Sequence, residues 1–299
     1  MKFLCDFDGV LTDITAEARL VYDIFCTELR NCGGLPAARV DALLQQTHAT
    51  LAAAPQQYGW REHGRIAAYA NEDAFMANVG LANGLDDASR TVESDAALLV
   101  QRLRQQGVAS YSQLAQQAYQ TMVDETRAGK RQPVEPEAVE TLQRLLHAGH
   151  QIVIVSNSST DRILDLLGRC GLRPDDHGAN PAGQFRVRGD ARKFHLDAAV
   201  TNRGFTVGDY WIDAARPTYE AIIRDEQPSV AIGDVFSLDL GMPYFLAGHE
   251  PAQFDGLHLW LRQRPYTPGW SRAFITDASA KHCEIRLLPT IGELATRYC

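Results

Sequence analysis

The sequence lacks a long apolar run that is free of charges. No stretch approaches the roughly 18 apolar residues needed to cross a bilayer, so we expect no membrane partner. The first ten residues, MKFLCDFDGV, contain only a short apolar run, which Asp6 and Asp8 interrupt. This pattern is not typical of a signal peptide. Together these absences predict a cytoplasmic protein.

The cysteines and histidines lack the spacings of disulfide frameworks and metal sites. The six cysteines are scattered and form no CxxC pair, so we expect free thiols in a reducing compartment. The nine histidines show no metal-ligand spacing. The chain also contains no heptads, internal repeats or low-complexity tracts. It is expected to fold as ordinary globular domains.

Clustered positive charge is lacking as well. The net charge is -8, which argues against nucleic acid as a partner. A small phosphorylated substrate needs only local positive charge and is compatible with this balance. The length of 299 residues and the hydrophobic share of 45% predict a sizeable core divided over about two domains. No pattern predicts an oligomeric state.

Predicted strands and helices alternate along most of the chain. The β-branched run QIVIV at residues 151–155 is typical of a buried parallel strand. Other apolar runs predict strands at residues 2–5, 184–188, 205–213, 229–233 and 244–246. Amphipathic patterns predict helices at residues 137–146, after Ser158, from Pro217 and at residues 289–298. This alternation predicts an α/β fold in which helices cover both faces of a parallel sheet.

A helical segment interrupts this pattern near its start. The chain from about residue 35 to about residue 131 is rich in Ala, Gln and Leu and contains no run that resembles a buried strand. Helices are predicted at residues 40–54, 72–82, 95–107 and 111–127. We therefore expect a core formed by residues 1–14 and 136–299 and an inserted helical domain at residues 15–135. Residues 248–286 show no clear pattern.

Polar residues with catalytic potential follow three of the predicted strands. They are Asp6 and Asp8 after the first strand, Ser156 and Asn157 after QIVIV, and Asp234 and Asp239 after SVAIG. Any one of these groups could be a turn former or a helix cap. In open α/β sheets, however, functional residues gather at the carboxyl ends of strands. Three such strand ends in one chain predict a single site.

These motifs resemble those of the haloacid dehalogenase superfamily. DFDGVLTD at residues 6–13 is similar to the first motif of that family, SN at 156–157 to the second, and GDVFSLD at 233–239 to the fourth. The resemblance covers residues 1 to about 15 and 136 to about 247. It implies a Rossmann-like, doubly wound parallel sheet, with the helical insertion as a mobile cap domain.

The resemblance implies a role for each carboxylate of the first motif. Asp6 would attack phosphorus and form an aspartyl-phosphate, which water then hydrolyses. Asp8 would protonate the leaving oxygen and then activate the water. Haloacid dehalogenases and phosphonate-cleaving relatives generally lack an acid at the position of Asp8. The sequence therefore favours a phosphatase that acts on phosphomonoesters.

The resemblance also implies a Mg²⁺ site and a phosphate site. The cation would be held by the Asp6 carboxylate, the backbone carbonyl of Asp8 and the Asp234 carboxylate, since Mg²⁺ prefers oxygen ligands. Asp239 would support these ligands without binding the cation itself, and direct binding of the cation by Asp239 is the alternative. Ser156 and Asn157 would bind phosphoryl oxygens.

Two residues compete for the cation of the third motif, a Lys or Arg that stabilises the transferring phosphoryl group. Arg216, in ARPTYEAII, precedes the helix before the SVAIG strand, which is the position expected of the motif. Lys193, in GDARKFH, is the residue type that the family prefers, but it precedes the predicted strand at 205–213. The predicted strand order favours Arg216 as the catalytic cation.

The predicted function is that of a Mg²⁺-dependent phosphatase acting on a small phosphorylated metabolite. A phosphomutase would use the same carboxylates and remains an alternative. A catalytically silent protein of this fold, kept for binding or scaffolding, is a second alternative. Loss of Asp6 or Asp234 would mark such a protein, and both residues are present.

Overall fold

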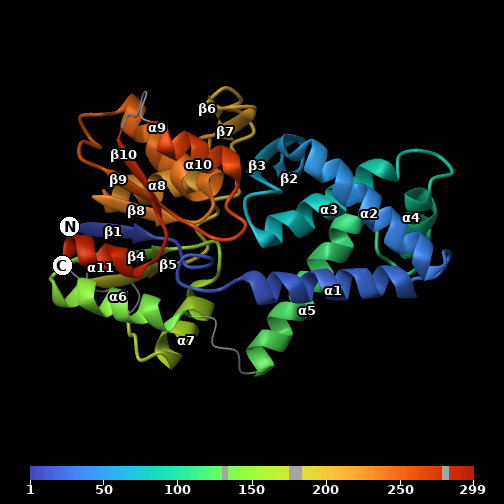
Figure 1. Cartoon of the computed structure of the whole chain (residues 1–299), viewed down its shortest axis with the longest axis horizontal. Helices are drawn as coiled ribbons and strands as arrows, with labels where there is room; N and C mark the ends of the chain where they lie inside the picture. Colours follow the sequence, from blue (N-terminus) through green and yellow to red (C-terminus); the bar gives the residue numbers. More distant parts are fainter. Residues whose placement is uncertain (130–133, 175–183, 278–282) are drawn as a thin grey trace. The chain divides into compact units, whose positions relative to one another are not determined.

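The chain forms two compact units in the computed structural model, which describes residues 1–129, 134–174, 184–277 and 283–299 (Figure 1). The first unit comprises Met1–Asp13, Glu62–Ala67 and Gln132–Cys299, and the second comprises Ile14–Arg61 and Ala68–Arg131. An insertion at residues 15–135 was expected. The division differs from that expectation chiefly at Glu62–Ala67, a short segment from within the insertion that groups with the first unit.

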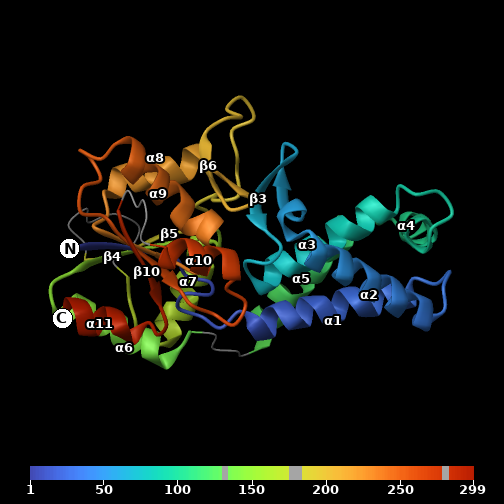
Figure 2. The ribbon, with the colours of Figure 1, turned by 45° about the horizontal axis from the view of Figure 1, so that its top comes forward.

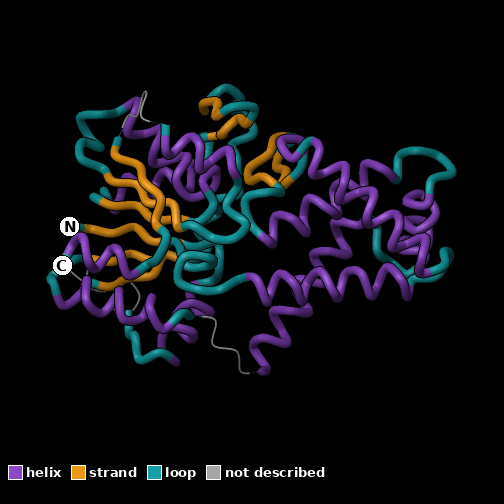
Figure 3. The backbone as a smooth tube through the Cα atoms, in the orientation of Figure 1, coloured by secondary structure: helices purple, strands orange, loops and turns teal. Residues whose placement is uncertain are grey.

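A six-stranded sheet lies at the centre of the first unit. Its strands are β1 (Lys2–Cys5), β4 (Gln151–Val155), β5 (Phe185–Arg188), β8 (Val230–Gly233), β9 (His258–Arg262) and β10 (Glu284–Leu288). Their order is β10-β9-β8-β1-β4-β5, and every neighbouring pair is parallel (Figure 3). The predicted α/β fold with a parallel sheet is confirmed.

Helices cover both faces of this sheet, as Figures 1 and 2 show. The helices α6 (Pro136–His147), α7 (Thr160–Arg169) and α11 (Gly292–Tyr298) lie on one face, and α8 (Pro217–Glu226) and α9 (Gly241–His249) lie on the other. Alternate strand residues such as Phe3, Ile152 and Val230 pack in one buried cluster with side chains of α6, α7 and α11. This alternation follows from the two-residue period of a strand.

Two predicted strands of the sheet have a different structure. Residues 205–213 form an antiparallel hairpin, β6 (Gly204–Val207) and β7 (Tyr210–Asp213), in a separate two-stranded sheet. The chain turns at Gly208, which has a φ of 56°, between the two strands. Residues 244–246 lie inside α9 rather than in a strand. They are buried there, as they would be in the predicted strand. A short apolar run does not distinguish a buried strand from a buried helix.

The segment at residues 248–286, for which no structure was predicted, extends the sheet. It contributes β9, α10 (Gly269–Thr276) and the start of β10. The final helix predicted at residues 289–298 is present as the shorter α11. None of the helices in the described part of the chain is long and apolar enough to cross a membrane.

The second unit consists mainly of helices around a core of its own. They are α1 (Thr15–Asn31), α2 (Ala37–Ala53), α3 (Ala74–Ala88), α4 (Asp95–Gln105) and α5 (Tyr111–Gly129), with a 3₁₀ turn at Pro55–Gln57. The buried core includes Phe25, Leu85 and Tyr111. The helices α2 to α5 agree with those predicted from the Ala- and Leu-rich stretch.

The expectation that this stretch contains no strand is wrong. A hairpin of β2 (Gly59–Glu62) and β3 (Arg65–Tyr69) lies between α2 and α3. Its turn is formed by His63 and Gly64, with φ values of 50° and 76°. Two successive left-handed residues are typical of a tight hairpin turn. Sequence reasoning missed the hairpin because its strands are only four and five residues long and contain a single β-branched residue, Ile66.

Candidate active site

The predicted site residues come together at one edge of the sheet in the first unit. Strands β4, β1 and β8 are adjacent and parallel, so their carboxyl ends share an edge. Asp6, Ser156 and Asp234 each follow one of these strands directly. The loop after β5, the next strand along, brings Lys193 to the same edge. The first unit therefore supplies all of these groups by itself.

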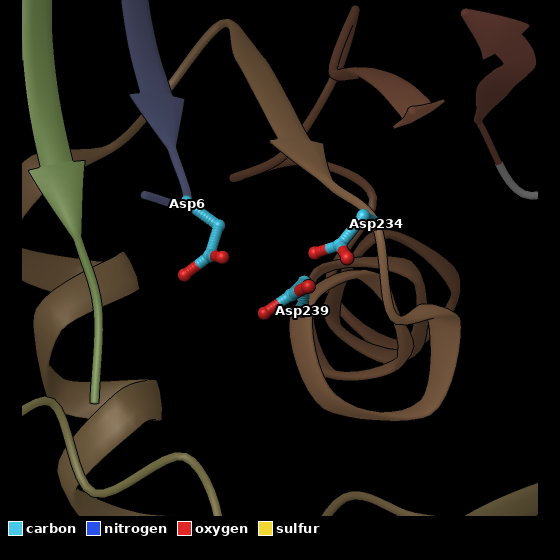
Figure 4. A group of neighbouring side chains, drawn as sticks. All are labelled: Asp6, Asp234 and Asp239. Atoms are coloured by element: carbon cyan, nitrogen blue, oxygen red, sulfur yellow. The ribbon is translucent and has the colours of Figure 1, made fainter. Parts of the chain in front are cut away.

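Three carboxylates converge at this edge. Asp6, Asp234 and Asp239 each offer an oxygen within 4.8 Å of the others (Figure 4). Their exposed fractions are 8%, 2% and 2%, so water screens them little. Asp239 lies in a π-helical turn, Phe236–Leu240, and its Oδ2 accepts a hydrogen bond from the backbone N–H of Val235 at 3.0 Å. This bond fixes the direction of the Asp239 carboxylate.

The ammonium of Lys193 lies between two of these carboxylates. Its Nζ is 2.6 Å from Asp6 Oδ1 and 2.8 Å from Asp239 Oδ1. Burial disfavours the charge on Lys193, but Asp239 and Asp6 outweigh this effect and raise the pKa of the ammonium. Lys193 is therefore a permanently charged cation in direct contact with Asp6.

The charge at the site suits a divalent cation. One ammonium against three buried carboxylates leaves two formal negative charges. Burial raises the pKa of the Asp6 carboxyl, and the nearby ammonium of Lys193 offsets this effect only in part. Gly9, with a φ of 80°, runs so close to Asp234 that a Cβ would lie 1.9 Å from Oδ2. The cluster of carboxylate oxygens within 4.8 Å of one another fits Mg²⁺, which prefers oxygen ligands.

Arg216 does not occupy the position that we predicted for it. Its guanidinium is fully buried and donates hydrogen bonds to backbone carbonyls at 2.9 Å, 2.6 Å and 3.1 Å, and to that of Lys193. The first three carbonyls belong to Asp213, Ala67 and Ser237. The prediction was wrong because it counted residues 205–213 as a strand of the main sheet.

The loop that presents Lys193 depends on the second motif. The side-chain carbonyl of Asn157 accepts a hydrogen bond from the backbone N–H of Lys193 at 2.7 Å. The backbone N–H of Ala191 donates to the carbonyl of Ser156 at 2.9 Å. Asp190 and Arg192 have φ values of 52° and 48°, which shows how tightly this loop turns. The available signal was a lysine shortly after the predicted strand at 184–188.

Asp8 is surrounded by hydrogen-bond donors. Its Oδ2 accepts from the hydroxyls of Ser158 at 2.7 Å and Ser156 at 3.2 Å, and its Oδ1 pairs with Arg162 Nη1 at 2.9 Å. Sequence reasoning named Ser156 but missed Ser158 and Arg162. Ser158 lies just before the N-cap of α7 and Arg162 lies in the first turn of that helix, where its Nη1 also donates to the Ser158 hydroxyl at 2.5 Å. Their position next to the second motif was the available signal.

The comparisons with known proteins identify the family. A family model of haloacid dehalogenase-like hydrolases matches residues 3–185, more than half of the chain. No curated protein matches the sequence of this chain.

Several solved structures are similar at low identity. They include magnesium-bound YfnB from Bacillus subtilis, with 14% identity over 99% of this chain and 97% of that chain and a TM-score of 0.43. A 2-haloacid dehalogenase from Pseudomonas syringae pv. Tomato has 13% identity over 100% and 99% of the two chains and a TM-score of 0.40. CbbY from Rhodobacter sphaeroides, in complex with phosphate, has 13% identity over 98% and 95% and a TM-score of 0.39.

The family match covers β1, β4 and the loops after them, which hold Asp6, Asp8 and Ser156. The parallel sheet and the carboxylates at its edge agree with that match. The chain belongs to the haloacid dehalogenase-like hydrolase family.

Proposed function

We propose that this hydrolase is a Mg²⁺-dependent phosphatase that removes phosphate from a small phosphomonoester through an aspartyl-phosphate on Asp6. The observation that carries the proposal is the contact between Lys193 Nζ and Asp6 Oδ1 inside a cluster of three carboxylates. A nucleophile flanked by a fixed cation and a site for a second one suits attack on a phosphate dianion, since the charges of both reactants must be neutralised.

Asp8 favours phosphate esters over haloacids as substrates. Ester cleavage leaves an alkoxide that needs a proton, whereas release of a halide needs none. Asp8 lies two residues after the nucleophile, and its carboxylate is 28% exposed, so a substrate and water can reach it. An acid at this position would have no purpose in dehalogenation.

In the first step, an Asp6 oxygen attacks phosphorus as the bond from phosphorus to the leaving oxygen breaks. Asp8 gives its proton to that oxygen, and the alcohol leaves. In the second step, Asp8 takes a proton from water, which attacks phosphorus and breaks its bond to Asp6. Inorganic phosphate and the free Asp6 carboxylate result.

The remaining residues bind and orient. The Asp6 and Asp234 carboxylates and the backbone carbonyl of Asp8 would hold Mg²⁺, which neutralises charge on the phosphoryl oxygens when bound. Lys193 would stabilise the same oxygens in the transition state, in the role first expected of Arg216. The Asn157 carbonyl is taken by Lys193, which leaves the Asn157 amide N–H₂ as a donor to phosphate. Ser156 would add its hydroxyl, and Asp239 would hold Lys193 in place.

The proposal is tested by incubating the full chain and Mg²⁺ with an aryl phosphate and a panel of phosphorylated metabolites. Release of inorganic phosphate that a chelator abolishes is the expected result. In parallel, a 2-haloacid is supplied and halide release is measured. Halide release without phosphate release would overturn the proposal in favour of dehalogenation. Turnover of neither substrate class would favour a silent binding protein.

A further inference from the structure

The loop between β9 and α10 reaches the candidate active site from the carboxyl-terminal part of the chain. It contains Arg264 and Tyr266, both partly buried. The family match ends at residue 185, so it does not account for this loop. Each of the two side chains contacts a different part of the proposed cation site.

Tyr266 contacts a proposed ligand directly. Its hydroxyl donates a hydrogen bond to Asp234 Oδ2 at 2.8 Å. Asp234 is 2% exposed, so bulk water does not compete freely for that oxygen. A donor on one carboxylate oxygen fixes the rotation of the group and therefore the position of both oxygens relative to Asp6 and Asp239.

Arg264 binds the backbone of the loop at residues 9–12, in which Gly9 lies against Asp234. Its Nη2 donates to the carbonyl of Thr12 at 2.9 Å, and its Nε donates to the carbonyl of Gly9. Its Nη1 pairs with Glu135 Oε1 at 2.6 Å, and the backbone N–H of Glu135 donates to the carbonyl of Leu11. Arg264 and Glu135 together clamp the loop that presses Gly9 against Asp234.

We infer that the β9–α10 loop completes the cation site, with Tyr266 as the positioning residue for Asp234 and Arg264 as the positioning residue for the loop at residues 9–12. The inference rests on the cation site of the proposed function. Neither residue needs to touch the cation or the substrate. Both fix the oxygen donors before the cation binds. Binding of the cation then does not have to supply the free energy of ordering these donors.

The test measures binding of Mn²⁺, a paramagnetic stand-in for Mg²⁺, by the electron paramagnetic resonance signal of the free ion. Tyr266→Phe removes one hydroxyl and keeps the ring, and it should weaken Mn²⁺ binding by about 10- to 100-fold. Tyr298→Phe is the matched control, since its hydroxyl also has partners, His258 and Trp260, but lies elsewhere. That variant should bind Mn²⁺ like the parent chain. Asp234→Asn, which removes a ligand, sets the scale of a full loss.

A second measurement separates positioning from general damage. Thermal unfolding of Tyr266→Phe without a cation should match that of the parent chain, while the upward shift of Tm produced by Mg²⁺ should shrink. Arg264→Lys keeps a positive charge but replaces three separated donor nitrogens, which bind Gly9, Thr12 and Glu135, with a single ammonium, and its Mg²⁺-induced shift should shrink as well. If the parent binds Mn²⁺, Asp234→Asn loses it and Tyr266→Phe does not weaken it, the inference fails alone. If the parent binds no Mn²⁺, the cation site of the proposed function fails with it.

Discussion

Arg216 donates a hydrogen bond to the backbone carbonyl of Lys193, the residue whose ammonium contacts Asp6. The two candidates for the cation of the third motif are therefore joined by a hydrogen bond. Lys193 places a charge beside Asp6, and Arg216 binds the backbone carbonyls of Lys193, Ala67 and Ser237. Their substitutions should have different effects.

Lys193→Met keeps the length of the side chain and removes its charge. We expect kcat to fall by about 10²-fold or more, because a fixed charge that stabilises the transition state is lost. Arg216→Met should instead lower the free energy of unfolding by about 3 kcal/mol or more, because several buried carbonyls lose their donor. Denaturant unfolding and steady-state kinetics of both variants decide between the roles. A fully stable Arg216→Met without activity, beside an active Lys193→Met, would restore Arg216 as the catalytic cation.

Asp6→Asn should abolish turnover and leave the chain folded. The amide is a poor nucleophile and a weak cation ligand, so kcat should fall below about 1% of the parent value, a loss of roughly 3 kcal/mol in transition-state stabilisation. Acid-quenched mass spectrometry should detect a phosphoryl group on the parent chain during turnover and none on the variant. Retained activity above that level would count against Asp6 as the nucleophile.

Gly9→Ala should damage the cation site more than the backbone. Gly9 and Gly149 have nearly equal φ values, 80° and 82°, but only at Gly9 would a Cβ collide with another group, the Asp234 carboxylate. Gly149→Ala should therefore cost about 1 kcal/mol of stability from left-handed strain and leave kcat unchanged. Gly9→Ala should pay the same strain and also displace Asp234, with weaker Mg²⁺ binding and lower kcat. Equal kinetics in the two variants would show that Asp234 can move without consequence.

Arg162→Gln should slow the second half of the proposed reaction. Three donors, Ser156, Ser158 and Arg162, hold the Asp8 carboxylate in place, and in the proposed second step this carboxylate takes a proton from water. With a good aryl leaving group, the first step needs little help, so the variant should accumulate phosphoenzyme and show a burst of the phenol. Arg169→Gln, on the same helix and paired with Asp165, is the control and should show no change. Without a burst in Arg162→Gln, Arg162 has no role in that step.

The sequence predicted the parts of the site that lie directly after strands. Asp6, Ser156 and Asp234 each follow a short β-branched or apolar run, and the direction of a parallel strand fixes where its next residue lies. Lys193 was ranked below Arg216 because residues 205–213 were counted as a strand of the main sheet, and the loop that carries Lys193 has no regular pattern. Its two left-handed residues, Asp190 and Arg192, are not types whose conformation a sequence pattern fixes.

Contacts between distant segments were beyond sequence reasoning. Nothing local to Tyr266 or Arg264 indicates that these side chains reach Asp234 and Gly9, because strand order in the sheet decides it. The hairpin at residues 204–213 shows the same limit. A pattern of apolar residues gives a strand its period but does not say which sheet it joins.

The central position of β1 sets a condition on how this protein is made. Lys2 pairs with Gln151 and Phe3 pairs with Val230, so both neighbours of β1 are synthesised long after it. Until both neighbours are present, the backbone groups on the two edges of this apolar strand are unpaired. Unpaired strand edges favour association with other incompletely synthesised chains. The helices α1 to α5 depend on nearer contacts and can form in the meantime. Asp6, which directly follows β1, is thus synthesised well before the two strands that fix its place in the sheet.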